Sequence, residues 1–178
     1  AETDIYARGA LTAIGTGPDS YGAKAAKVGL FNTYGSSKTG MPLDLTMEGK
    51  AGAFTGTWNS FKSSHYSGEV GDSAANAVAW DEETALTAYQ YIHFVGDGVK
   101  TVSTFSELST ALSQSSPSIK RIYITKDITV TAKLCLRNPV AIVGVGDEAP
   151  VLTRGSSCTG AMFQMGTNNE YTGHVRMQ

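Results

Sequence analysis

Charged residues are scarce in this chain of 178 residues: Asp, Glu, Lys and Arg make up 17% of it, and the formal net charge is −2. A protein that binds nucleic acid needs a basic patch that neutralises phosphates, so this composition argues against a nucleic-acid partner. Long apolar runs are also missing. None approaches the roughly 18 residues that a membrane-spanning helix requires, so we expect no membrane insertion.

Cysteine and histidine are also rare, with two and three residues. The two cysteines, Cys135 and Cys158, are too few for a disulfide framework, and neither stands at metal-ligand spacing from His65, His93 or His174. The acidic residues of the second half are scattered along the chain. We therefore expect no catalytic residue, metal or cofactor. A Cys135–Cys158 disulfide would suit an extracellular protein, but two free thiols are equally compatible with the sequence.

Glycine, with 20 residues, and hydroxyl side chains take the place of charge. In residues 1–98 glycine interrupts short segments in which small apolar and hydroxyl residues alternate, which is typical of irregular β structure. We predict strands in the segments GALTAIG, KVGLFNTYG, LDLTMEG and GAFTGTW. A helical turn in AKAA, residues 23–26, is an alternative, although Gly22 and Gly29 flank it closely.

The next part of this region is less regular. Residues 63–80 are polar at their start and are predicted to form a long loop. Asp81 is a candidate helix N-cap, and the two glutamates that follow it would favour the start of a short helix. The segment AYQYIHFV is then aromatic and β-branched, which predicts a strand.

Five large aromatic side chains of residues 1–98 are candidate contacts for glycans or for a protein interface. Aromatic rings in hydroxyl-rich surroundings can stack on sugars or anchor an interface, although such rings more often fill a core. The candidates are Trp58, Tyr66, Trp80, Tyr89 and Tyr91.

Local signals become clearer after residue 98. Thr104 stands three residues before Glu107, which is the spacing of a capping box. An apolar stripe at helical spacing follows, made of Phe105, Leu108 and Leu112. The sequence therefore predicts an amphipathic helix over residues 105–113.

From position 121 onwards, short alternating segments follow one another with no room for a crossover helix between them. The Asn-Gly and Asp-Gly pairs of tight hairpins are absent from this part of the chain. We predict instead a coil of parallel strands with circuits of roughly 20 to 25 residues. Residues 122–124, 142–145 and 162–165 are expected on successive rungs, with Cys135 and Cys158 as stacked neighbours. With Leu134 and Leu136 inward, Cys135 should point outward or into a neighbouring layer.

The segments TFSELSTAL, KRIYITKDITVTAKLCL and PVAIVGVGDEAPVLTRG, in this order, resemble the start of a right-handed parallel β-helix of the pectate-lyase-like kind. Bacterial surface adhesins, secreted polysaccharide lyases and phage tailspikes share that architecture. The resemblance covers residues 99–178 and implies that helix 105–113 caps the first rung. We thus expect a mainly β chain with a β-rich region over residues 1–98, of no recognised family, and the start of a β-helix over residues 99–178.

These features lead us to expect an extracellular structural or adhesive module of a bacterial surface or phage fibre protein, at the cell surface or on a virion, and without enzymatic activity. The last predicted strand leaves an open end, which we expect further residues or another subunit to cover, so self-association is expected. Glycans are candidate partners. The alternative is a fragment or subunit of a carbohydrate-active enzyme, a polysaccharide lyase or hydrolase.

Overall fold

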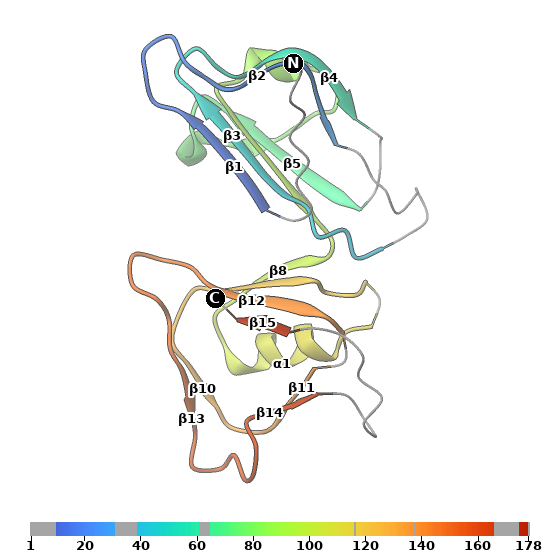
Figure 1. Cartoon of the computed structure of the whole chain (residues 1–178), viewed down its shortest axis with the longest axis vertical. Helices are drawn as coiled ribbons and strands as arrows, with labels where there is room; N and C mark the ends of the chain where they lie inside the picture. Colours follow the sequence, from blue (N-terminus) through green and yellow to red (C-terminus); the bar gives the residue numbers. More distant parts are fainter. Residues whose placement is uncertain are drawn as a thin grey trace. The chain divides into compact units, whose positions relative to one another are not determined.

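The computed structural model describes residues 10–30, 39–60, 65–115, 117–136, 138–165 and 175–177. The chain forms two compact units, residues 1–96 and 97–178 (Figure 1), which we call unit 1 and unit 2 and describe separately. The division lies two residues before the boundary expected after residue 98. The described chain is mainly β, as the sequence predicts, and no helix within these ranges is long and apolar enough to cross a membrane.

Unit 1 contains a five-stranded sheet with the order β1-β3-β7-β5-β6 and a two-stranded sheet of β2 and β4. β1 and β3 pair in parallel, and the other pairs of the larger sheet are antiparallel. In chain order the elements are β1 (Ala10–Gly15), β2 (Tyr21–Leu30), β3 (Asp44–Gly49), β4 (Gly52–Ser60), β5 (Tyr66–Gly71), the 3-10 helix η1 (Ala74–Asn76), β6 (Val78–Ala79), the 3-10 helix η2 (Leu86–Ala88) and β7 (Tyr91–Gly96).

The first four strands form two stacked arches. β1 and β2 are joined by a turn but lie in different sheets, and β3 and β4 repeat this arrangement. β1 then pairs in parallel with β3, and β2 with β4. The turn between β3 and β4 requires glycine at two positions. A Cβ on Gly49 would collide with the carbonyl oxygen of Gly52, and the φ of Gly52 is 156°. Each arch therefore places one strand in each sheet.

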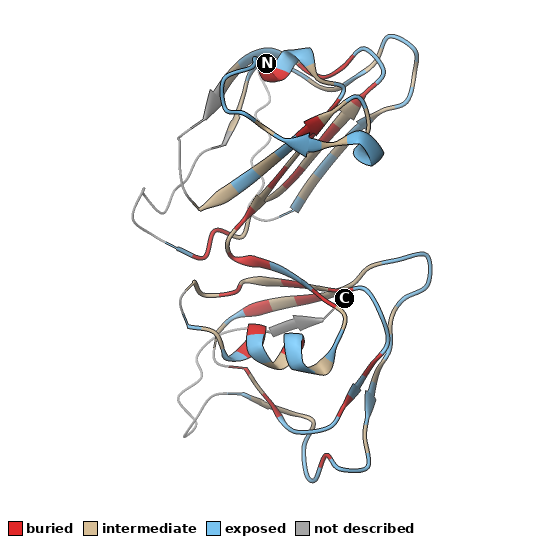
Figure 2. Ribbon diagram, turned by 180° about the vertical axis from the view of Figure 1, so that it is seen from behind, coloured by how far each residue is buried: buried red, intermediate tan, exposed pale blue. Residues whose placement is uncertain are grey.

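The core of unit 1 lies between these two sheets. Ile92 and Phe94 of β7 are fully buried, and Met47 of β3 and Val70 of β5 lie opposite Ile92 in register. Phe54 of β4 joins them from the smaller sheet. Buried and partly exposed positions alternate along β3 (Figure 2), which is the pattern of strands with one face in the core.

In unit 1 the structure rejects the helical alternative and corrects the loop prediction. The helical alternative for AKAA is not formed, because these residues belong to β2, where the register against β4 shifts between Lys24 and Lys27. The loop predicted over residues 63–80 contains the strands β5 and β6.

The helix predicted after Asp81 is also wrong, since only the single turn η2 is present. The Asp81 carboxylate instead accepts hydrogen bonds from the backbone N–H groups of Glu83, at 2.9 Å, and Thr84, at 2.8 Å, and closes a turn. The strand predicted in AYQYIHFV is confirmed as β7.

Unit 2 consists of three parallel ladders. The first has the order β15-β12-β9-β8, the second pairs β10 with β13, and the third pairs β11 with β14. The chain visits the ladders in turn and then repeats. The strands are β8 (Val99–Val102), β9 (Arg121–Ile124), β10 (Ile128–Val130), β11 (Leu134–Leu136), β12 (Val140–Gly144), β13 (Leu152–Arg154), β14 (Phe163–Met165) and β15 (Val175–Met177).

Parallel pairing without hairpins is confirmed among the described strands. Three of the five circuits have the predicted length, and the last, from Val140 to Val175, spans 35 residues. Arg121 pairs with Ala141, 20 residues later, and Ile128 pairs with Leu152, 24 residues later. The circuit from β11 to β14 is longer, with Leu134 opposite residue 163, because the connections around β13 are longer. The expectation that residues 162–165 stack on residues 142–145 is therefore wrong: β14 stacks on β11.

The predicted helix is confirmed as α1 (Phe105–Ser113), in the connection between β8 and β9. The Glu107 N–H donates to the Thr104 hydroxyl at 3.3 Å, and the Glu107 carboxylate accepts from the Thr104 N–H at 3.1 Å, which completes the capping box. Leu108 and Leu112 are buried in the core of unit 2. α1 contacts strands of all three ladders, namely β8, β10 and β11, and Figures 1 and 2 show it lying across the triangle that the ladders outline.

Candidate functional site

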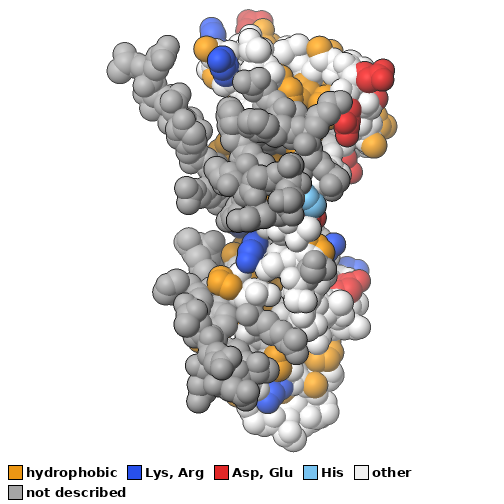
Figure 3. Space-filling view, turned by 90° about the vertical axis from the view of Figure 1, so that its right-hand side faces the viewer, with side chains coloured by type: hydrophobic (Ala, Val, Ile, Leu, Met, Phe, Trp, Pro, Cys, Tyr) orange, Lys and Arg blue, Asp and Glu red, His pale blue; other side chains and the backbone are white. Residues whose placement is uncertain are grey.

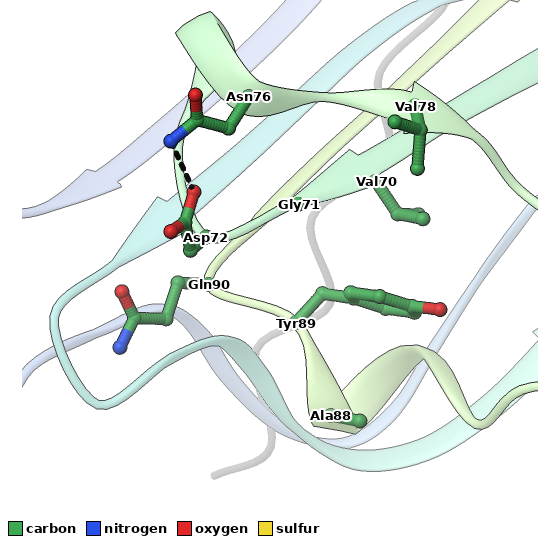
Figure 4. Close-up of a pocket in the computed structure, with 8 residues that line it drawn as sticks. All are labelled: Val70, Gly71, Asp72, Asn76, Val78, Ala88, Tyr89 and Gln90. Carbon is green, nitrogen blue, oxygen red and sulfur yellow. Dashed lines mark hydrogen bonds between the residues drawn. The ribbon is translucent and has the colours of Figure 1, made fainter.

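A groove of about 320 Å³ lies in unit 1, between the end of β5 with η1 and β6 on one side and the junction of η2 with β7 on the other (Figure 4). Figure 4 shows the apolar side chains of Val70, Val78 and Tyr89 at one end of it and the polar side chains of Asp72, Asn76 and Gln90 at the other. The full lining is Val70, Gly71, Asp72, Asn76, Val78, Ala88, Tyr89 and Gln90.

Backbone hydrogen bonds hold Tyr89 in place. Its N–H donates to the carbonyl of Leu86 at 3.2 Å, and its own carbonyl accepts from the N–H of Ala53 at 2.8 Å. The neighbouring Gln90 N–H donates to the carbonyl of Gly71 at 3.1 Å and so ties the two walls together. The backbone of Tyr89 is thus fixed at the groove, and its half-buried ring packs against the core of unit 1.

Asp72 supplies a negative charge at the polar end. One of its carboxylate oxygens accepts hydrogen bonds from the Asn76 side-chain amide at 3.1 Å and from the Ser73 hydroxyl at 3.0 Å. These bonds, that from Asn76 foremost, lower the pKa of Asp72 below its usual value. The carboxylate is therefore ionised at neutral pH.

The Gln90 amide is oriented by a bond on its donor side. Its Nε2 donates to the carbonyl of Lys50 at 3.2 Å, which leaves its amide oxygen as the acceptor. No Lys, Arg or His side chain is among the residues that line the groove. The groove thus combines an apolar end with a polar end that carries a net negative charge.

A second polar cluster lies on the face of the larger sheet that points away from the core. The His93 imidazole lies 2.9 Å from a carboxylate oxygen of Asp44, measured from Nε2, and 3.9 Å from one of Glu69, measured from Nδ1. The hydrogen bond to Asp44 raises the pKa of His93 above its usual value, although partial burial opposes the shift. The ring of Tyr91 lies 6.4 Å from the imidazole.

Tyr91 is buried on the same face. Burial, with the negative charges of Glu69, Glu48 and Asp44, raises the pKa of Tyr91 above 10.0, so its hydroxyl remains protonated at neutral pH. Within the described ranges, no three His, Cys, Asp or Glu side chains are close enough to hold a metal ion.

The five aromatic residues that the sequence singled out are divided among three places. Trp58, Tyr66 and Trp80 surround Phe94 at ring-centroid distances of 5.4, 5.5 and 5.7 Å, and they pack against the core of unit 1. Tyr91 lies in the His93 cluster, and Tyr89 lines the groove. Of these rings, only that of Tyr89 belongs to the groove.

The two cysteines are free thiols. Cys135 is partly exposed between the buried Leu134 and Leu136, as predicted, and it lies opposite Gln164 in the β11–β14 ladder instead of opposite Cys158. Cys158 is buried in the core of unit 2.

Sequence reasoning missed the polar residues of both clusters. Asp72, Asn76 and Gln90 meet because β5 and β7 are neighbours in the sheet, and Asp44 meets His93 because β3 pairs with β7. The Asp-x-x-x-Asn spacing at residues 72–76 was the one local signal, and it is common in turns of every kind.

Comparison with known proteins finds no family model that matches the chain, and no curated protein or solved structure that is significantly similar to it.

Proposed function

We propose that unit 2 is the start of a right-handed parallel β-helix and that the chain is a structural or adhesive module of an extracellular fibre or surface protein, of a bacterium or a phage. Stacked parallel ladders support this role, because each further circuit lengthens the stack by one strand spacing, about 4.8 Å, along a single axis. Such a stack makes a rod that can carry another domain, here unit 1.

The position of α1 supports a cap at the first rung. In the first circuit the chain forms β8 and then α1, and only in the next circuit does it reach the second and third ladders with β10 and β11. α1 contacts both of these strands and places Leu108, Ala111 and Leu112 in the core. It thereby covers apolar side chains that would otherwise meet water at that end.

The observation that carries the proposal is the loss of burial from one rung to the next. Leu136 of β11 is 1% exposed, whereas Met165, which lies directly above it in the same ladder, is 57% exposed. Leu134 is buried and its neighbour Phe163 only partly so. An apolar position that is buried on one rung and open on the next is what a stack shows when a further rung belongs above it.

The strand edges lead to the same conclusion. Among the described residues β13 pairs only with β10, β14 only with β11, and β15 only with β12, so each leaves one edge without a strand partner. Unpaired edges beside exposed apolar residues such as Val151, which is 56% exposed, favour the addition of another strand. We propose that further chain or a second copy supplies it.

Charge does not oppose such assembly. The net charge is only −2. In Figure 3 acidic side chains gather along one margin of unit 1, whereas the described part of unit 2 shows charged side chains of both signs among uncharged ones. Long-range repulsion between copies is therefore weak.

Light scattering over a wide range of concentration tests the assembly. We expect a mass that rises above 18.7 kDa with concentration, and a smaller rise for Met165→Lys or Val151→Lys, which place a charge at the open rung. Thr129→Lys, which also changes an exposed strand residue but one on the covered rung, is the matched control. A chain that stays monomeric at every concentration contradicts self-assembly.

A second assay addresses the enzymatic alternative. The chain is incubated with acidic polysaccharides, with and without calcium, and unsaturated products are followed by absorbance. We expect no turnover. Sustained product formation would contradict a purely structural role and favour a subunit of a polysaccharide lyase.

A further inference from the structure

We infer that the groove of unit 1 binds a neutral saccharide, with the sugar ring against Tyr89 and its hydroxyl groups on Asp72, Asn76 and Gln90. The inference concerns unit 1 alone and adds a ligand class to the adhesive role. It does not depend on whether unit 2 assembles.

The groove has one apolar end and one polar end, and a sugar ring likewise has an apolar face and a polar rim. A pyranose has a face of C–H groups and a rim of hydroxyl groups. Val78, which is 64% exposed, and the ring of Tyr89 offer an apolar surface at one end of the groove. The polar end presents a carboxylate and two side-chain amides (Figure 4). A ligand with only one of these characters would leave half of the groove without suitable contacts.

The backbone that carries the Tyr89 ring is fixed before any ligand arrives, and the ring packs against the core of unit 1. The Tyr89 backbone is bonded on both sides to Leu86 and Ala53, and Val70 behind it is 1% exposed. Since Tyr89 has only two side-chain torsions, little conformational entropy is lost when a ring stacks on it. A rigid aromatic surface of this kind is the usual platform for the C–H face of a sugar.

The polar groups favour a ligand that donates hydrogen bonds. A carboxylate has about four acceptor positions, and Asn76 and Ser73 occupy two on one oxygen of Asp72. The Gln90 amide nitrogen is engaged by Lys50, which leaves its oxygen as an acceptor. A sugar hydroxyl can donate to the carboxylate and accept from the remaining Asn76 N–H. Adjacent hydroxyl groups of a sugar therefore match the acceptor and donor groups at this end of the groove.

The charge of the groove selects among saccharides. Asp72 is ionised, and none of the lining residues is a cation that could offset a second negative charge. A uronic acid or a sulfated sugar would place like charges close together at this end. The groove therefore accepts neutral sugars and rejects acidic ones.

Affinity gel electrophoresis of the full chain tests this inference, with mannan, galactan and dextran as neutral probes and polygalacturonate as the acidic probe. We expect at least one neutral probe to retard the chain and polygalacturonate to leave it unretarded. Tyr89→Ala should weaken the retention about tenfold, whereas Tyr89→Phe, which keeps the ring, should retain most of it.

Two further variants separate binding from folding. Val78→Glu alters an exposed position of the groove and should abolish retention while the circular dichroism spectrum stays unchanged. Tyr21→Ala removes a tyrosine that is 38% exposed in the same unit, outside the groove, and should leave retention intact.

Several outcomes would overturn the inference: no neutral probe is retained, Val78→Glu binds as well as the parent, Tyr89→Phe loses as much as Tyr89→Ala, or polygalacturonate binds as tightly as the neutral probes. A chain that binds mannan but stays monomeric in light scattering would support this inference and contradict only the assembly proposed for unit 2.

Discussion

Both units contain parallel strand pairs, but the strands that follow these pairs differ between the two units. In unit 1 two arches stack, β1 on β3 and β2 on β4, and the antiparallel strands β7, β5 and β6 then complete the larger sheet. In unit 2 every pairing between the described strands is parallel, and the same three ladders are revisited. Antiparallel addition ends the repetition in unit 1, whereas unit 2 keeps a geometry that can continue.

The cores of the two units also differ in the kind of side chain that fills them. The core of unit 2 is mainly aliphatic, and Ile122 of β9 stacks on Ile142 of β12. The core of unit 1 is built around one aromatic ring, Phe94, which contacts the rings of Trp58, Tyr66 and Trp80. Aliphatic side chains can occupy the same inward position on successive strands of a ladder. The aromatic cluster, in contrast, brings together residues from strands that are distant in sequence.

Phe94→Ala should have the largest effect, because it removes the centre of the aromatic cluster. Phe94 is 0% exposed, and truncation of a buried phenylalanine costs about 4 kcal/mol in the free energy of unfolding. Both tryptophans of the chain lie in unit 1, so denaturant unfolding followed by tryptophan fluorescence reports on this unit alone. An unchanged midpoint would show that the cluster does not hold unit 1 together.

Ile122→Ala should weaken unit 2 somewhat less, by about 3 kcal/mol, because it removes fewer buried atoms than the truncation of Phe94. Ile122 is 0% exposed in β9, the second strand of the first ladder. Hydrogen exchange of the backbone amides in β9 and β12 should become faster, while Thr129→Ala, at an exposed position of β10, should leave it unchanged. Equal acceleration by both variants would contradict the inward stacking of Ile122.

The contrast between the two units also explains which of their features could be predicted from the sequence. In unit 2 the signals are local: the capping box of α1 and the alternation in β9 to β12 lie within a few residues. The error there concerned register, because the lengths of the turns around β13 decide whether β14 stacks on β11 or on β12, and no local pattern fixes them.

In unit 1 the decisive contacts are distant in sequence. β5 was missed because the position that faces Phe94 is Gly68, where a Cβ would collide with the ring, so the strand lacks an apolar residue there. The His93–Asp44 pair joins residues 49 positions apart. The groove likewise depends on the pairing of β5 with β7, which follows from the topology and not from any motif.

Thr104→Ala should have a smaller effect, on the proposed cap of unit 2. The Thr104 hydroxyl accepts from the Glu107 N–H, and loss of such an N-cap costs about 1 kcal/mol. Thr110→Ala, an exposed change in the middle of the same helix, is the matched control and should not destabilise it. Exchange of the α1 amides measures the difference, and equal rates in the two variants would mean that the capping box contributes nothing.

The smallest effect is expected from pH, and it should act on unit 1. The hydrogen bond to Asp44 raises the pKa of His93 in the folded state above its unfolded value of about 6.5, so the folded protein binds the proton more tightly. The resulting stabilisation is fully present below the unfolded pKa and is lost as the pH rises through the folded pKa. Since His93 is partly exposed, about 1 kcal/mol or less is at stake. Tryptophan-detected unfolding from pH 5 to pH 9 should show this decline, and His93→Gln or Asp44→Asn should flatten it, whereas an unchanged slope in both variants would assign the pH dependence to other groups.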